Sequence, residues 1–198
     1  MSESVETKTA AVPDGRRLRS ERSRQAIIDA CHELTAEGVL GPTAQQMADR
    51  AGMGIRSFFR HFSDMEDLFA TIDAQSRESF EAMYVGGDRS GTVHERIQHA
   101  IERHAEGYES QKNSIKSTLA QMWRYKVLRK SYARYQRGLR KDLDDWLPEL
   151  RALSRPDREA VDALASAEMW LRLRDQQGLS RKVAIEILVE LISRLLEK

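Results

Sequence analysis

The residues best suited to hold a charged partner are concentrated in one short stretch, GIRSFFRHF, at residues 54–62. Three phenylalanines and two arginines fall within it, although aromatic residues make up only 7% of the chain. An arginine guanidinium can pair with two acceptors on a guanine edge or with a phosphate group. Arg56 and Arg60 are therefore candidate contacts to nucleic acid. The alternative is that both are ordinary solvated arginines on a helical hairpin.

A second group of basic residues lies close to the N-terminus. Residues 16–62 carry eight basic and five acidic side chains, whereas residues 63–198 carry 23 of each, and the whole chain has a formal charge of +1. Such a local excess suits attraction to phosphate, but it is also common on solvated arms. Five arginines of this segment fall within nine residues: Arg16, Arg17, Arg19, Arg22 and Arg24.

The elements that must position these residues all have the pattern of helices. No segment alternates strictly between apolar and polar residues, as a half-buried strand would. Thr43, Ser63 and Thr92 each begin a capping box, which marks the start of a helix. The chain is therefore expected to be an all-α protein. The expected helices run from Ser20 to Gly38 and over 43–50, 55–62, 63–84, 93–109, 114–124, 125–147, 156–177 and 181–197.

We expect a disordered tail at 1–15, a DNA-binding helix-turn-helix domain at 16–62 and a larger helical domain at 63–198. In the helix-turn-helix, residues 55–62 form the recognition helix, which would lie in a major groove. Its outward face should carry Ile55, Arg56, Ser57 and Arg60. Its inward face should share a core with the two preceding helices, formed by Ile27, Leu34, Met47, Ala48, Phe58 and Phe62.

The segment from Thr43 to Gly52, together with Phe58-Phe59-Arg60-His61-Phe62 and Glu66-Asp67-Leu68, resembles the tetracycline-repressor (TetR) family of bacterial regulators. The remainder of the chain is similar to that family only in layout. The resemblance implies a repressor that binds a palindromic DNA operator as a homodimer and is released by a small-molecule effector. It assigns DNA contacts to Thr43, Gln45, Ile55, Arg56, Ser57, Phe59 and His61. Arg60 is added as a phosphate contact because it lies later on the recognition helix.

Three residues depart from the family pattern. Gly54 stands where a capping Ser or Thr is usual, and Phe59 and Met65 stand where the family has a tyrosine and a lysine that reach phosphates. Glycine is tolerated at a helix N-cap, so the first change weakens the cap only modestly. We expect Arg56, Arg60 and the basic segment 16–24 to replace the two lost phosphate contacts.

The larger domain has two expected roles. The last two helices carry apolar stripes and small residues that suit close packing, so they could pair with a second copy or bury within one chain. The expected dimer interface comprises Val161, Leu164, Ile187, Leu188, Leu191 and Leu195. The middle helices could enclose an apolar or amphipathic effector, although many of the same residues would serve equally as core. The candidate effector contacts are Phe80, Met83, Tyr84, His104, Tyr108, Asn113, Leu119, Met122, Trp123, Met169 and Trp170.

Other functions find less support in the sequence. No Glu-x-x-His pair or His-Glu-x-x-His motif occurs, and the regular spacing of His94, His99 and His104 turns these side chains to different sides of a helix. We therefore expect no enzyme activity, no cofactor and no metal. The remaining alternatives are a ligand-independent architectural DNA binder and a helical-bundle enzyme.

Nothing in the sequence directs the chain to or across a membrane. No apolar run approaches the length of a membrane span, and the N-terminus lacks an export signal. The single cysteine, Cys31, excludes an internal disulfide and is expected to be a small buried side chain. These features favour a cytoplasmic protein without a membrane partner.

Overall fold

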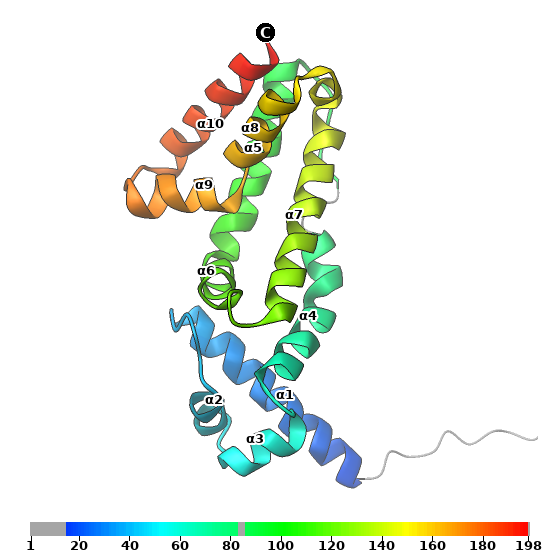
Figure 1. The fold of residues 1–198 in the computed structure, drawn as a ribbon, viewed down its shortest axis with the longest axis vertical. Helices are drawn as coiled ribbons and strands as arrows, with labels where there is room; N and C mark the ends of the chain where they lie inside the picture. Colours follow the sequence, from blue (N-terminus) through cyan, green and yellow to red (C-terminus); the bar gives the residue numbers. More distant parts are fainter. Residues whose placement is uncertain (1–14, 83–85, 198) are drawn as a thin grey trace, which may run out of the picture.

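The computed structural model describes residues 15–82 and 86–197, and within these ranges the chain consists of helices without a strand (Figure 1). The expectation of an all-α protein is confirmed. The elements are α1 (Gly15–Ala36), α2 (Ala44–Arg50), α3 (Ile55–His61), α4 (Met65–Ala82), α5 (Val93–Ser110), α6 (Lys112–Gln121), α7 (Lys126–Trp146), the 3-10 helix η1 (Pro148–Ala152), α8 (Arg155–Leu164), α9 (Ala167–Leu171), the π-helical turn η2 (Arg172–Gln176) and α10 (Arg181–Leu196).

The first helix begins earlier than the expected cap at Ser20. It starts at Gly15, so the arginine-rich segment is helical, while residues 1–14 of the expected tail lie outside the described residues. Side-chain interactions one turn apart support this extension. Arg17 pairs with Glu21 at 3.0 Å, and the Arg19 Nε donates to the Gly15 carbonyl at 3.1 Å.

The helix-turn-helix has the expected local geometry. The Thr43 hydroxyl accepts from the Gln46 N–H, and the Gln46 side chain accepts from the Thr43 N–H at 2.9 Å, which confirms the capping box. Between α2 and α3, Gly52 has a φ of +66°, a conformation that favours glycine. Gly54 is the N-cap of α3 and makes no side-chain cap.

The expected capping box at Ser63 is wrong by one residue. Helix α4 starts at Met65, and the Asp64 carboxylate accepts from the Asp67 N–H at 2.8 Å. An aspartate is as good a cap as serine, so the local sequence offered two choices. Glu66 is thereby free to accept from the Val127 N–H at 2.9 Å, at the start of α7.

Two separate hydrophobic cores hold the molecule together. The smaller core, in the three-helix head, buries the expected residues Ile27, Leu34, Met47, Ala48, Phe58 and Phe62, and it extends into α4 through Leu68 and Phe69. The larger core joins α5, α7, α8, α9 and α10. In Figure 1 the head lies at the end of the molecule farthest from the C-terminus, and α4 leads from it into the body.

The expected helix 156–177 is interrupted. Helix α8 ends at Leu164, the Ser166 side chain caps α9 by accepting from the Met169 N–H, and η2 follows as a π-helical turn. The Tyr108 hydroxyl donates to the Ala165 carbonyl at 2.7 Å, which satisfies a carbonyl at the break. A serine that can cap a helix is the local signal for this break.

Candidate nucleic-acid interface and ligand cavity

The recognition helix α3 presents two arginines to solvent. Arg56 and Arg60 are exposed, and neither forms an ion pair with another residue in the described ranges. Arg50, one helix earlier, differs because its guanidinium pairs with Glu37 at 2.7 Å and with Glu33 at 3.3 Å. These bonds raise the pKa of Arg50 further above its ordinary value. The charge of Arg56 and Arg60 is thus available to an external partner.

The three phenylalanines of α3 and its end have different environments. Phe58 and Phe62 are fully buried in the head core, whereas the Phe59 side chain is 53% exposed. The Phe59 ring packs edge-on against Phe58, with the centroids 5.2 Å apart. Phe59 therefore offers an apolar ring to the surface that carries the arginines, and it has no hydroxyl with which to bind a phosphate.

The other expected DNA contacts lie on α2 and α3. Ile55 and Ser57 are half-buried at the start of α3, and Ile55 packs against the head core. Thr43 and Gln45 are exposed on the preceding helix. Thr43 is engaged in the α2 cap, and the Gln45 amide donates to Asp49 at 2.7 Å. Thr43 and Gln45 thus lie at the start of α2, and Ile55 and Ser57 lie at the start of α3.

His61 points partly into the head. Its Nε2 is buried and makes no hydrogen bond with another described residue. Burial lowers the pKa of His61, and the positive charges of Arg60 and Arg24 lower it further. Both effects favour the neutral imidazole in the chain without DNA.

One arginine of the basic segment has a structural role. Arg24 donates to the Thr71 hydroxyl on α4 at 2.8 Å, and its guanidinium lies 4.7 Å from the centre of the Phe62 ring. It thereby connects α1 to both α3 and α4. The basic segment 16–24 is consequently not a uniform set of phosphate ligands.

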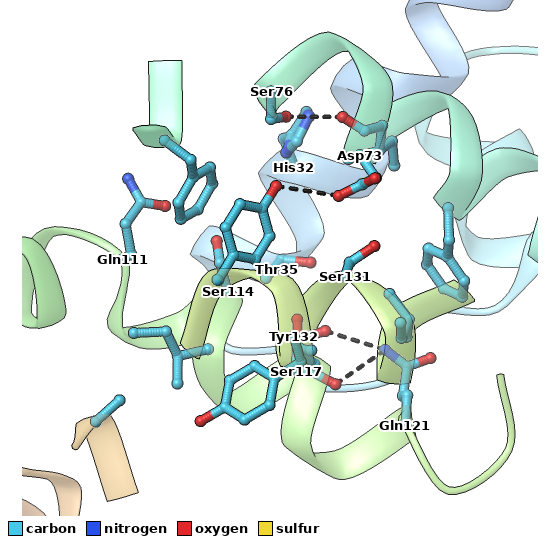
Figure 2. Close-up of a pocket in the computed structure, with 18 of the residues that line it drawn as sticks. His32, Thr35, Asp73, Ser76, Gln111, Ser114, Ser117, Gln121, Ser131 and Tyr132 are labelled. Atoms are coloured by element: carbon cyan, nitrogen blue, oxygen red, sulfur yellow. Dashed lines mark hydrogen bonds between the residues drawn. The ribbon is translucent and has the colours of Figure 1, made fainter. Parts of the chain in front are cut away.

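A cavity of about 470 Å³ lies where the head meets the body. Its walls come from α1, α4, α5, α6, α7 and α9, and Figure 2 shows that polar side chains from several of these helices converge on it. A volume of this size is typical of sites for drug-sized ligands. The lining residues are Cys31, His32, Thr35, Phe69, Ile72, Asp73, Ser76, Ser79, Phe80, Tyr108, Gln111, Ser114, Ile115, Ser117, Thr118, Gln121, Leu128, Ser131, Tyr132, Tyr135, Gln136, Leu139 and Ala167.

Of the residues expected to contact an effector, Phe80 and Tyr108 line this cavity. Met83 and Tyr84 lie outside the described residues. The residues expected to contact an effector were mostly large and apolar, whereas much of the observed lining consists of serine, threonine and glutamine. The others expected do not line it: His104, Asn113, Leu119, Met122, Trp123, Met169 and Trp170.

Several of these residues have other partners. His104 is buried and its Nε2 lies 3.0 Å from the Asp142 carboxylate, while Trp170 is a core residue that donates to Glu109 at 3.2 Å. Met169 packs against the same core. Trp123 is 77% exposed at the turn between α6 and α7. These placements depend on tertiary packing, which residue type alone does not determine.

The charged group in the cavity wall is tightly compensated. Asp73 on α4 accepts from Arg134 and from the Tyr135 hydroxyl at 3.0 Å, both on α7, and from Arg77 at 3.2 Å. Burial raises the pKa of Asp73, but hydrogen bonds from Arg134, Ser131, Tyr135 and Arg77 outweigh it and hold the pKa below its ordinary value. Asp73 is therefore an ionised carboxylate with its charge neutralised locally.

Two hydrogen bonds from α6 connect the body to the head. The Gln121 amide, in the cavity wall, donates to the Leu40 carbonyl at 3.0 Å in the connection that leads to α2. The Asn113 amide donates to the Ala36 carbonyl at the end of α1, 2.8 Å away. Asn113, expected as an effector contact, instead holds the two regions together.

Cys31 is buried in the cavity wall, as expected for a small apolar residue. Desolvation raises the pKa of its thiol to about 11. Since the thiolate is the reactive form, this cysteine is unreactive at neutral pH.

Some residues of the expected dimer interface are buried in the core of the chain itself. Val161 and Leu188 are buried in the larger core, so they are not available to a second chain. On α10, Leu191 remains 38% exposed and Ile187 is half-buried. Val183, which is 39% exposed, lies one turn before Ile187 on the same face. Leu164 and Leu195 are half-buried.

Two features are absent from the part of the chain that the structure describes: a membrane-spanning helix and a metal-binding cluster. None of its helices is long and apolar enough to cross a membrane. It also holds no cluster of three or more His, Cys, Asp or Glu side chains placed to bind a metal ion.

The head matches a known family and a known relative. Residues 27–72 match the family described as bacterial regulatory proteins, tetR family. An uncharacterised HTH-type transcriptional regulator of Haemophilus influenzae is 38% identical over 55 residues. That match spans 27% of each chain, so the similarity to this relative is confined to about a quarter of its length.

Solved structures match the fold over most of its length. A transcriptional regulator from Rhodococcus sp. Rha1 superposes with a TM-score of 0.64 at 17% identity, over 90% of this chain and 96% of the other. The multidrug-binding protein EbrR, solved with ethidium, gives a TM-score of 0.57 at 21% identity, over 86% of this chain and 98% of the other. These two proteins are described as a transcriptional regulator and a multidrug-binding protein. The helix-turn-helix head is thus similar to the tetR family of bacterial regulatory proteins, and the helical fold is similar to that of these solved structures over most of the chain.

Proposed function

We propose that the chain is a repressor of transcription that binds a palindromic DNA site as a homodimer and leaves it when a small molecule occupies the cavity. The observation that carries the proposal is the exposed pair Arg56 and Arg60 on α3, without an ion pair in the described ranges. Exposed arginines on a recognition helix suit base edges and phosphates. Arg56, nearer the start of the helix, would read a base, and Arg60 would bind the backbone.

The proposed division of the chain places its boundary just before α4, although the head core extends into that helix. Residues 16–62 would hold the DNA, with the basic start of α1 adding phosphate contacts in place of those lost at Phe59 and Met65. Residues 63–198 would bind the effector and the second subunit. A partner on chromosomal DNA implies a cytoplasmic location, which is part of the same proposal.

The proposed dimer uses α10 with the edge of α8. Val183, Ile187 and Leu191 recur every four residues and form a continuous apolar stripe on the outside of the chain. Exposed ion pairs on the same helix, Lys182–Glu186 and Arg194–Glu190, would form a polar rim. A two-fold dimer would place two α3 helices in successive major grooves, about 34–36 Å apart.

Release by an effector would use the connections between cavity and head. A wall of the cavity is formed by α1 itself, through Cys31, His32 and Thr35, so a ligand there would press directly on the head. Gln121 could exchange its bond to Leu40 for one to the ligand. A ligand would also displace α4, which lines the cavity and is joined to the head. A coupling of about 1–3 kcal/mol would reduce DNA affinity about 5–150-fold.

Footprinting on the DNA upstream of the chain's own gene tests the proposed DNA function. We expect a protected palindrome whose half-sites lie about 10 base pairs apart, centre to centre. Absence of any protected palindrome at a protein concentration of several micromolar would contradict a sequence-specific regulator of its own gene.

A further inference from the structure

Few charged side chains line the cavity. Among the described residues the lining includes no lysine and no arginine, and its only carboxylate is that of Asp73. His32, the only histidine of the lining, is exposed at its edge. Any charged ligand must therefore find its counter-charge in Asp73 or in the arginines behind it.

Those charges are already paired with one another. One Asp73 oxygen accepts from both Arg134 and Tyr135, and the other accepts from Arg77. An incoming ammonium would have to displace Arg134 from a half-buried pair, and an incoming carboxylate would have to displace Asp73. Breaking one partner from a buried ion pair leaves an uncompensated charge, which is costly.

The lining nevertheless offers polar groups that have no partner within the chain. The side chains of Gln111, Ser114 and Thr118 line the cavity and make no hydrogen bond with another described residue. Figure 2 shows Gln111 and Ser114 beside the aromatic rings of the wall. Aromatic surface with neutral donors and acceptors is suited to a ligand that is apolar over most of its area and carries hydroxyl or carbonyl groups.

We propose, on the basis of the proposed effector function, that the cavity selects uncharged aromatic or alicyclic molecules bearing hydroxyl or carbonyl groups, and excludes both organic cations and carboxylates. The neutralised Asp73–Arg134 pair is the element that sets this selectivity. Each charge of this pair is already neutralised by the other, so neither is available to a charged ligand. The free amide and hydroxyl groups of Gln111, Ser114 and Thr118 supply the polar contacts.

The test uses three probes with one skeleton and different charge: 2-naphthalenemethanol, 2-naphthoate and 2-naphthylmethylammonium. Binding to the full chain at pH 7 is measured by titration calorimetry. We expect the alcohol to bind at least about tenfold more tightly than either ion, a difference of about 1.4 kcal/mol. Equal or tighter binding of either ion would overturn the proposal, and so would failure of the alcohol to bind at its solubility limit.

Reciprocal variants test the role of the charge pair. Asp73→Asn leaves Arg134 without its carboxylate, so affinity for 2-naphthoate should rise about tenfold. Arg134→Met leaves Asp73 with one guanidinium partner fewer, so affinity for the ammonium probe should rise instead. Circular dichroism and thermal melting establish that each variant is folded. Folded variants whose probe preference equals that of the unmodified chain would show that the pair does not set selectivity.

A matched pair of variants on α6 locates the binding. Thr118→Phe fills the cavity and should abolish binding of the alcohol probe, whereas Ala120→Phe introduces the same ring at an exposed position outside the lining and should leave binding unchanged. Unchanged binding in Thr118→Phe would place the probe elsewhere and overturn the proposal. Footprinting of the ligand-free chain tests the DNA function separately, so the two proposals can fail independently.

Discussion

Arg56 and Arg60 on α3 extend into solvent without an ion pair in the described ranges, whereas Arg134 on α7 is held by Asp73 in the wall of the cavity. The same side chain thus serves opposite purposes at the two regions. On the head its charge is left available for a polyanion. In the cavity its charge is cancelled, and the wall behaves as a neutral surface. The state of pairing, more than residue type, separates the two sites.

The largest expected effect concerns the two neighbouring rings of α3. Phe58→Ala removes a fully buried ring and should lower the free energy of unfolding by about 3–5 kcal/mol. Phe59→Ala removes a half-exposed ring and should cost less than about 1 kcal/mol. Urea denaturation followed by circular dichroism measures both. Similar losses for the two variants would contradict their different placement.

The proposed subunit interface offers a second contrast, between positions less than one turn apart. Leu191→Asp places a charge on the exposed face of α10 and should weaken dimerisation by about 2 kcal/mol or more, while the monomer remains folded. Leu188→Asp buries the charge in the core and should unfold the body. Sedimentation velocity and thermal melting distinguish the outcomes. An unmodified chain that sediments as a monomer at micromolar concentration would refute the interface.

The connection between cavity and head should be sensitive to Gln121. Gln121→Leu removes the bond to the Leu40 carbonyl and should cost about 1 kcal/mol locally. Amide hydrogen exchange in residues 40–43 should then rise about fivefold. Gln136→Leu is the matched control, since Gln136 also lines the cavity but its amide bonds to Glu168, away from the head. Equal exchange rates in the two variants would show that Gln121 does not connect the cavity to the head.

The smallest expected effect is a pH dependence from His61. Its pKa in the folded chain is below the ordinary value of 6.5, because burial and nearby arginines disfavour the charged ring. The unfolded chain therefore takes up the proton first as the pH falls, so stability declines as the pH is lowered from about 6.5 through the folded-state pKa. His61→Gln cannot titrate and should flatten this decline in thermal melts between pH 7 and 5. An identical decline in the variant would assign it to other groups.

The head was predictable because its signals are local. The capping box at Thr43 and the spacing of Phe58 and Phe62 each act within a few residues, and the structure confirms both. The start of α4 was misplaced because Ser63 and Asp64 are both good caps. Local competition of this kind shifts a boundary without changing the fold.

The cavity was not predictable in the same way. Its walls combine α1 with five helices of the body, so its lining depends on how distant segments pack. Large apolar side chains indicated Phe80 and Tyr108, but they gave no indication of Asp73, Gln121 or the serines. Those residues occur on partly polar helix faces that resemble solvent-exposed surface. Polar residues at helical spacing on several neighbouring helices are the signal that could have indicated them.

The central claim is that α3 reads a palindromic site, with Arg56 reading a base and Arg60 binding the backbone. Selection of bound duplexes from random DNA tests it whatever the sequence of the site. We expect the unmodified chain to enrich a palindrome, Arg56→Ala to relax preference at one position of each half-site at a cost of about 1–3 kcal/mol, and Arg60→Ala to keep the same preference with weaker binding. No enriched palindrome, or an unchanged preference in Arg56→Ala, would contradict the account.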